Sequence, residues 1–226
     1  MALHVGTSGF SYPEWVGSFY PPKTPAGRFL GEYASRLNAV EINNTFQRLP
    51  RDEALAKWVA DTPAQFKLCL KAQRALTYSA AAFPKAEVAR QFGARVAQLG
   101  DRAGPVLVQF PPTQKRNPEL LETLLESLGR PAAVEFRDPG WLDAEVYSVV
   151  TRHGGAVVVT DQEDWPLAEA AGEFGYFRLR RDYSEEELAP WIRRLAAEAE
   201  RRDVYVFFRH SPLAPERALR LLAAAC

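Results

Sequence analysis

Short apolar runs recur along the chain, and between them lie stretches whose apolar positions follow helical spacing. The runs are rich in β-branched and aromatic residues and have Gly or Pro nearby, which favours strands over short helices. The eight predicted strands cover residues 3–8, 39–43, 66–72, 105–110, 132–137, 155–160, 175–180 and 203–208.

Most intervals between these strands carry the pattern of helices. In the first interval Phe29, Tyr33 and Leu37 fall on one helix face. A later helix has Asn117 as its N-cap and Pro118 in its first turn. The link between the sixth and seventh strands has room only for a short helix. The other predicted helices cover residues 26–37, 51–61, 84–99, 117–128, 142–153, 185–202 and 213–225.

The alternation of strands and helices predicts the fold class. Repeated strand–helix units favour parallel strands joined by right-handed crossovers. Eight such units fit a closed (β/α)₈ TIM-type barrel better than an open sheet, although 226 residues make a compact barrel. The short link predicts some irregularity around the sixth and seventh strands. Because no linker or change of composition divides the chain, residues 1–226 are expected to form a single TIM-barrel-like domain.

Composition narrows the classes of partner. Lys plus Arg and Asp plus Glu both number 28, so no overall field attracts nucleic acid or a membrane surface. The two cysteines, Cys69 and Cys226, make no disulfide framework, which is typical of a reducing compartment. The sequence has neither a signal-peptide pattern nor an apolar run long enough to cross a membrane. A cytoplasmic protein is expected.

Distinctive stretches of sequence are spread over roughly the first 180 residues. They are GTSGFSYPEWVGSFYP (6–21), VEINNTFQRLP (40–50), FKLCLKAQRALT (66–77), LVQFPP (107–112), VEFRDPGW (134–141) and YFRLR (176–180). These stretches resemble the domain of unknown function 72 family, also called YecE-like. The resemblance implies a TIM-type barrel and, since the family's activity is not established, no particular reaction.

The chain departs from this family's pattern near three strand ends. The family usually has a His-Gly pair at Arg180–Arg181 and an Asn-Asn pair at Arg209–His210. It tends to carry His and Ser where this chain has Asp138 and Gly140. This chain therefore differs from the family's pattern in the loops that follow three of its predicted strands.

Polar and charged residues lie near the ends of several predicted strands, often two positions apart. Side chains two apart share one face of a strand, and barrels of this type build ligand sites where their strands end. Because an unpaired buried charge is costly, these groups must pair, reach water or meet a ligand. The set comprises Glu41, Asn43, Lys71, Gln109, Glu135, Arg137, Asp161, Arg178 and Arg180.

These residue types favour an enzyme of unassigned reaction that acts on a small anionic or sugar-containing substrate. Glu41 and Glu135 are candidates for general acid and base. Arg137 and Arg178 offer planar forks for a phosphate or carboxylate, and Lys71 is a third cation or a proton donor. In the alternative interpretation the same residues form a paired polar layer that caps the barrel core.

The loops extend the candidate site. The loops after the seventh and eighth strands are rich in Arg and contain a His, where many barrels hold a phosphate. The first loop is aromatic and is either a stacking wall for a ring or a rigid cover over the barrel end. The residues predicted to contact substrate are Tyr12, Trp15, Asn43, Gln109, Arg137, Asp161, Arg178, Arg180, Arg209 and His210.

Two other function classes remain open. One is a protein that binds nucleic-acid ends or bases through the aromatic first loop and the basic last loops. The other is a non-catalytic anion-binding barrel. A metal centre is disfavoured because neighbouring cations would repel the ion, and no dinucleotide or Walker motif is present, so neither metal nor cofactor is predicted. The residues that would have to converge on a metal are Glu41, Glu135, Asp161 and His210.

Overall fold

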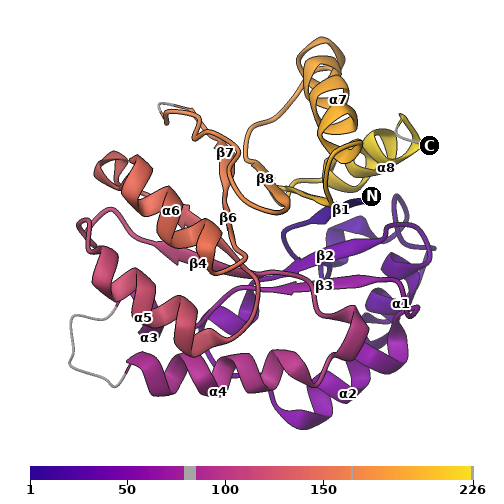
Figure 1. The fold of residues 1–226 in the computed structure, drawn as a ribbon. Helices are drawn as coiled ribbons and strands as arrows, with labels where there is room; N and C mark the ends of the chain where they lie inside the picture. The colour runs from indigo at the N-terminus through magenta and orange to yellow at the C-terminus, as the bar shows by residue number, and fades with distance from the viewer. Residues whose placement is uncertain (79–84, 164, 225–226) are drawn as a thin grey trace.

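Strands and helices alternate along the residues that the computed structural model describes, which are 1–78, 85–163 and 165–224 (Figure 1). The strands are β1 (Leu3–Thr7), β2 (Ala39–Ile42), β3 (Lys67–Leu70), β4 (Val106–Phe110), β5 (Ala132–Phe136), β6 (Ala156–Val157), β7 (Val159–Asp161), β8 (Gly175–Leu179) and β9 (Val204–Phe208). The α-helices are α1 (Phe29–Ala34), α2 (Asp52–Asp61), α3 (Arg74–Thr77), α4 (Lys85–Ala97), α5 (Pro118–Leu128), α6 (Ala144–Arg152), α7 (Glu185–Ala199) and α8 (Ala214–Ala224). Within these ranges no helix combines the length and the apolar character that crossing a bilayer requires.

The predicted strand at 155–160 is divided in two. Val158 separates the two parts. Before it, β6 pairs with β5, and after it, β7 pairs with β8. The short helix expected in the link that follows is absent from its described residues, so that prediction was wrong. The link instead runs back along β6, where the backbone N–H of Val157 donates to the carbonyl oxygen of Ala171 at 2.9 Å.

The other predicted strands and helices are present with small shifts in their bounds, whereas α3 was not predicted. The side chain of Asn117 accepts a backbone hydrogen bond at the start of α5, and Gly129 follows its end with a left-handed φ of 58°. The helix predicted over 26–37 begins as a 3₁₀ turn, and its α-helical part stops at Ala34. The predicted helix ends at Pro84 and residue 225 lie outside the described residues.

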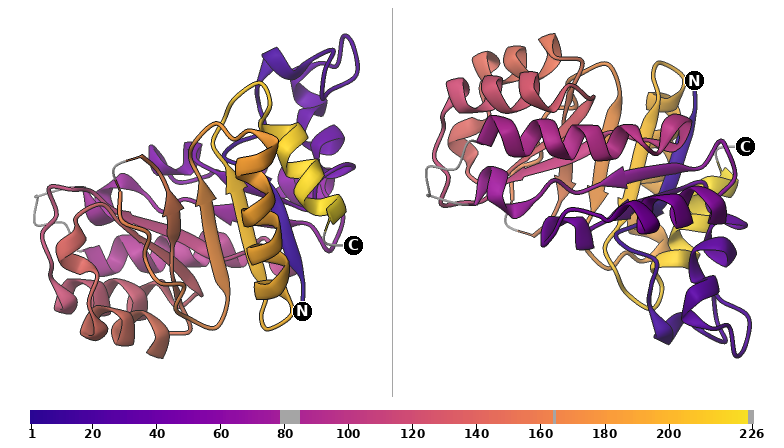
Figure 2. Two further views of the ribbon diagram at one scale, coloured as in Figure 1. Left: turned by 90° about the horizontal axis from the view of Figure 1, so that it is seen from above. Right: turned by 90° about the horizontal axis from the view of Figure 1, so that it is seen from below.

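Every strand pair is parallel. The strand orders are β1-β9-β8-β7, β4-β5-β6 and β2-β3. Single parallel bridges join Ser8 to Glu41 and Lys71 to Leu107, so β2 and β3 lie between β1 and β4. Figure 2 shows β1, β9, β8 and β7 running side by side. The fold is therefore a mixed α/β domain built on parallel sheets.

Apolar side chains pack on both faces of the strands. A large cluster fills the space between the strands and the helices, which lie outside them (Figure 1). A smaller cluster of buried apolar side chains lies on the other face of the strands. Glu41, Gln109 and Arg178 each follow a member of this cluster by two residues, so their side chains lie on the same face of the strands as the cluster. This inner cluster consists of Ala39, Cys69, Leu107, Ala133, Ala156, Val158, Phe174, Tyr176, Tyr205 and Phe207.

Strand β1 passes β2 so closely at Gly6 that a side chain there has no room. A Cβ atom at Gly6 would lie 1.9 Å from the carbonyl oxygen of Ala39 and 2.8 Å from the hydroxyl of Tyr33. We expect Gly6→Ala to lower the free energy of unfolding by about 1–3 kcal/mol, the usual cost of overpacking. Urea denaturation measures this effect. The control is Gly27→Ala, where no atom lies within 4 Å of the added Cβ, and equal losses in both variants would contradict the expectation.

Candidate functional site

A buried arginine joins two buried carboxylates on the face of the inner cluster. Arg178 on β8, Glu41 on β2 and Glu135 on β5 are 3%, 0% and 1% exposed. Arg178 donates from Nε to Oε2 of Glu41 at 3.0 Å and from Nη2 to Oε1 at 2.9 Å, which is a bidentate pair. Its Nη1 donates to Oε2 of Glu135 at 2.6 Å. One guanidinium group thus connects three strands.

Further donors complete the surroundings of Glu41. Oε1 accepts from Oγ of Ser8 at 2.8 Å and from Nδ2 of Asn43 at 3.1 Å. Oε2 accepts from the hydroxyl of Tyr176 at 3.0 Å. Asn43 follows Glu41 by two residues and Tyr176 precedes Arg178 by two, so the two-residue period of a strand places them beside the ion pair.

The carboxylate of Glu135 is equally occupied. Its Oε1 accepts from Oγ1 of Thr160 at 2.8 Å and pairs with Nη2 of Arg137 at 2.6 Å. Its Oε2 accepts from Nε2 of Gln109 as well as from Arg178. Each oxygen of Glu135 therefore already has two polar partners, counting hydrogen bonds and the ion pair with Arg137.

Both carboxylates are held in the ionised form. Burial is the largest single influence on the pKa of Glu41 and would raise it, but the charge and hydrogen bonds of Arg178, together with Arg180 and Ser8, outweigh burial and lower that pKa to about 2. Burial would likewise raise the pKa of Glu135, but Arg178 and Arg137, together with the hydrogen bonds from Thr160 and Gln109, bring it below its ordinary value. An acid–base catalyst needs a pKa near the working pH. We therefore interpret Glu41 and Glu135 as anchors of Arg178 and not as groups that exchange protons with substrate.

Lys71, immediately after β3, has different partners. Its Nζ donates to Oε1 of Gln109 at 2.8 Å and lies 4.2 Å from the ring centroid of Phe46. The hydroxyl of Tyr78 donates to the same Gln109 oxygen at 3.0 Å. Burial, followed by the charge of Arg178, lowers the pKa of Lys71 to about 8. No carboxylate in the described part of the chain forms an ion pair with Lys71.

Arg180, immediately after β8, also lacks an acidic partner among the described residues. Its Nη1 donates to Oγ of Ser8 at 3.0 Å, and Ser8 in turn donates to Glu41. Burial, followed by repulsion from Arg178, lowers the pKa of Arg180 to about 10. Arg180 is therefore a partly buried cation that forms no ion pair with any described carboxylate.

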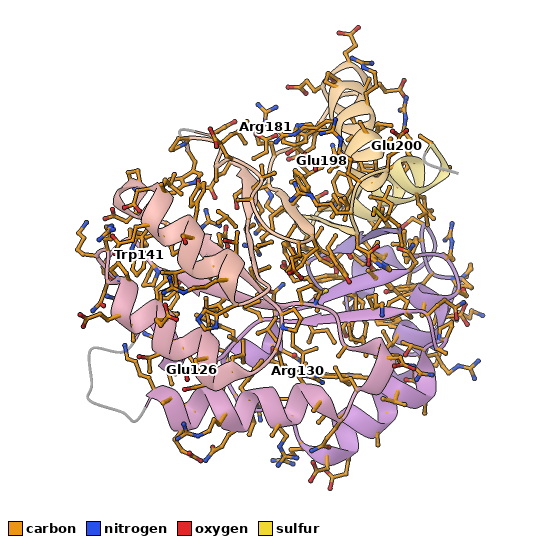
Figure 3. The ribbon with its side chains drawn as sticks, in the orientation of Figure 1. Glu126, Arg130, Trp141, Arg181, Glu198 and Glu200 are labelled. Atoms are coloured by element: carbon orange, nitrogen blue, oxygen red, sulfur yellow. The ribbon has the colours of Figure 1, made fainter. Side chains whose placement is uncertain are left out.

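Arg180 lines a hollow of about 710 Å³ formed with the loops after β7, β8 and β9. The other arginines of this hollow have acidic partners. Arg181, on the loop between β8 and α7 (Figure 3), donates to Oδ2 of Asp161 at 3.2 Å. Arg209 donates to Oδ2 of Asp182 at 3.2 Å. Asp161 thus faces Arg181 and not the buried network.

The first and last loops contact each other instead of leaving their aromatic faces open. Nε2 of His210 lies 2.6 Å from Oε1 of Glu14, and its ring stacks on Tyr12 with centroids 3.7 Å apart. Trp15 is fully buried and donates from Nε1 to the carbonyl oxygen of Ser211 at 3.1 Å. In this arrangement Trp15 serves as part of a rigid cover and offers no surface on which a base or sugar could stack.

The residues considered for a metal do not meet. Glu41 and Glu135 bind Arg178, whereas Asp161 and His210 have partners in separate loops. In residues 1–78, 85–163 and 165–224, no group of three or more His, Cys, Asp or Glu side chains could hold a metal ion.

Several residues of the buried network were not among those predicted, Thr160 among them. Ser8 and Tyr176 could have been found, because both lie on predicted strands and Tyr176 shares the two-residue period of Arg178. Phe46 and Tyr78 follow the second and third strands without a periodic signal. Only the folded chain brings their rings together, with centroids 5.1 Å apart.

Comparison with known sequences identifies relatives of this chain. The family model described as "Protein of unknown function DUF72" matches residues 4–225. UPF0759 protein YunF of Bacillus subtilis (strain 168) is 28% identical over 155 residues, which cover 64% of this chain and 54% of that protein. UPF0759 protein YecE of Escherichia coli (strain K12) is 29% identical over 111 residues, covering 49% of this chain and 38% of that protein. The chain thus spans about half or less of the length of these curated relatives.

Solved structures share the fold along nearly the whole chain. A DUF72 family protein from Thermotoga maritima MSB8 superposes with a TM-score of 0.86 at 28% identity, covering 99% of this chain and 98% of that one. A DUF72 family protein from Enterococcus faecalis V583 gives a TM-score of 0.77 at 20% identity, covering 98% and 96% of the two chains, and this likeness concerns the fold alone. Together with the match of the family model, these similarities establish that the chain belongs to the DUF72 family.

Proposed function

We propose that this protein is an enzyme that acts on a small anionic substrate held by Lys71 and Arg180. The observation that carries the proposal is the charge balance of the buried network. Its cations are Arg137 and Arg178, which pair with carboxylates, together with Lys71 and Arg180, which have no acidic partner among the described residues. A bound phosphate or carboxylate would supply the missing negative charge.

Closure of the strands into a single-domain (β/α)₈ barrel would gather these strand ends at one mouth. Two observations support closure. Single bridges connect β1 to β2 and β3 to β4, and Val158 connects β6 to β7 without an intervening loop. The inner cluster also draws side chains from strands in all three sheets.

The roles within the site follow from accessibility and charge. Glu41 and Glu135 have occupied oxygens and depressed pKa values, so they hold Arg178 in place beneath the anion. Lys71, with its pKa lowered to about 8, exchanges its proton closer to neutral pH than an ordinary lysine does. Lys71 is therefore the proposed proton-transfer group, in place of the two glutamates.

The test is binding of inorganic phosphate or pyrophosphate, measured by calorimetry with the intact chain. We expect Lys71→Met and Arg180→Met each to weaken binding by about tenfold or more, because a hydrogen bond to a charged group contributes about 1.5–3 kcal/mol. The matched control is Arg90→Met, which removes an exposed arginine paired with Glu87 on the same helix. Wild-type affinity in both site variants, or an equal loss in the control, would refute the anion site.

A further inference from the structure

We infer that Lys71 is a nucleophile, and that its amine forms a Schiff base with a small carbonyl compound carrying a carboxylate or phosphate group. This inference rests on the proposed anion site, because Arg180 would hold the charged group while Lys71 meets the carbonyl carbon. It adds a covalent step and a substrate class to a site that otherwise only binds an anion and moves a proton.

The partners of Lys71 allow its amine to become neutral. A lysine in a buried ion pair cannot lose its proton without leaving a carboxylate unpaired, which is strongly unfavourable. Nζ of Lys71 instead contacts the amide oxygen of Gln109 at 2.8 Å and the face of Phe46 at 4.2 Å. Neither partner is charged, so deprotonation leaves no buried charge without a counterion.

Burial and the balance of nearby charges favour the same change. Burial is the largest cause and Arg178 the next, Glu41 and Glu135 oppose them and Arg180 adds to them, and the pKa of Lys71 falls to about 8 from an ordinary value of 10.5. Each pKa unit changes the fraction of free amine tenfold, so at neutral pH Lys71 has on the order of a hundredfold more free amine than an ordinary lysine. Desolvation and neighbouring cations are the usual means of activating a nucleophilic lysine.

A proton donor lies next to the amine. The hydroxyl of Tyr78 and Nζ of Lys71 donate to the same oxygen of Gln109, at 3.0 and 2.8 Å. Burial, followed by the charge of Glu135, raises the pKa of Tyr78, so its hydroxyl stays protonated and can donate. Tyr78 is thus placed to protonate an oxygen atom formed beside Nζ.

The step balances without an oxidant or reductant. The nitrogen lone pair of Lys71 attacks the carbonyl carbon, the carbonyl π electrons move to oxygen, and that oxygen takes a proton from Tyr78. The nitrogen then loses a proton, which restores Tyr78. Tyr78 then protonates the carbinolamine hydroxyl, which leaves as water while the nitrogen lone pair forms the C=N bond, and the resulting iminium returns its proton to Tyr78 to give the neutral imine. Amine and carbonyl are thereby converted into imine and water.

Reduction with sodium borohydride tests the inference, because it converts an imine into a stable secondary amine. The intact chain is incubated with dihydroxyacetone phosphate or with pyruvate, reduced, and analysed by peptide mass spectrometry. We expect labelling at Lys71 to exceed that at Lys57 or Lys67 by about tenfold or more, because burial and neighbouring cations activate Lys71. Dihydroxyacetone, which lacks the phosphate, is the matched probe and should label Lys71 at least tenfold less.

Variants test the nucleophilic role of Lys71 separately from the anion site on which the inference rests. Lys71→Arg keeps the charge and should abolish labelling, whereas Lys67→Met should not change it. Tyr78→Phe should slow labelling without weakening phosphate binding. If phosphate binds but no adduct forms at Lys71, the nucleophilic role of Lys71 is refuted and the anion site is not. An adduct at Lys71 that phosphate does not suppress would refute the anion site, and equal labelling of all lysines would refute the nucleophile.

Discussion

Arg178→Met is expected to lower the free energy of unfolding by about 3–5 kcal/mol, the cost of breaking a buried ion pair by removing one partner. Arg178 donates to both Glu41 and Glu135, so its loss leaves two buried carboxylates short of positive charge. Equilibrium urea denaturation followed by circular dichroism measures the change. Failure of this variant to fold would agree with the expected direction.

A combined variant distinguishes loss of charge pairing from loss of packing. In the variant that joins Arg178→Met with Glu41→Gln and Glu135→Gln, no unpaired carboxylate remains, although Arg137 loses its partner Glu135, so we expect part of the lost stability to return. The surface control is Arg116→Met, which removes an exposed arginine paired with Asp143 and Glu145 and should change the stability little, because water screens exposed ion pairs. A loss within 1 kcal/mol for Arg178→Met would contradict the proposed role of the network.

Acid should destabilise the protein strongly through Glu41. Its pKa is about 2 in the folded chain and 4.5 ordinarily, and a carboxylate whose folded pKa is depressed stabilises the fold above its unfolded pKa. That contribution, about 3 kcal/mol, is fully present at neutral pH and is lost as the pH falls from about 4.5 through about 2. The pKa of Glu135 is shifted in the same direction, so its loss adds to the effect.

The measurement is the free energy of unfolding in urea across this pH range for the wild type and for Glu41→Gln. The variant lacks the titrating group, so its stability should fall less steeply with acid. The surface carboxylates are common to both proteins and cancel in the difference. Parallel curves for the two proteins would show that Glu41 has no depressed pKa in the folded state.

The two-residue period of the strands predicted most of the buried network from the sequence alone. Glu41, Glu135 and Arg178 lie on predicted strands, and their common face follows from the alternation of side chains. Sequence spacing could not show how their charges pair. That pairing depends on β2, β5 and β8 meeting in space, although each lies far from the others along the chain.

The role of the glutamates could not be predicted for the same reason. In the sequence Glu41 and Glu135 are two carboxylates near strand ends, which is equally typical of an acid–base pair and of a structural ion pair. Their hydrogen bonds and depressed pKa values favour the structural role. The contacts between the loops were harder still to predict from the sequence, because the stacking of His210 on Tyr12 joins residues from opposite ends of the chain.

The link after β7 shows why local sequence alone could not predict its structure. Its composition, DQEDWPLAEAAGEF, is compatible with a short helix, and local propensity gives no reason to reject one. The antiparallel bridge between Ala156 and Gly172 takes the link along β6 instead. A tertiary contact thus overrides the local preference.

The pairing of β1 with β9 bears on how this chain is made. β1 leaves the ribosome long before β9, yet Leu3 to Thr7 are in register with Val204 to Phe208. One edge of β1 therefore stays without its native neighbour while all the residues between β1 and β9 are made. Contacts so distant along a chain form late and slowly, and an exposed strand edge invites association with other chains. Protection of this edge until β9 has been made would therefore favour correct folding.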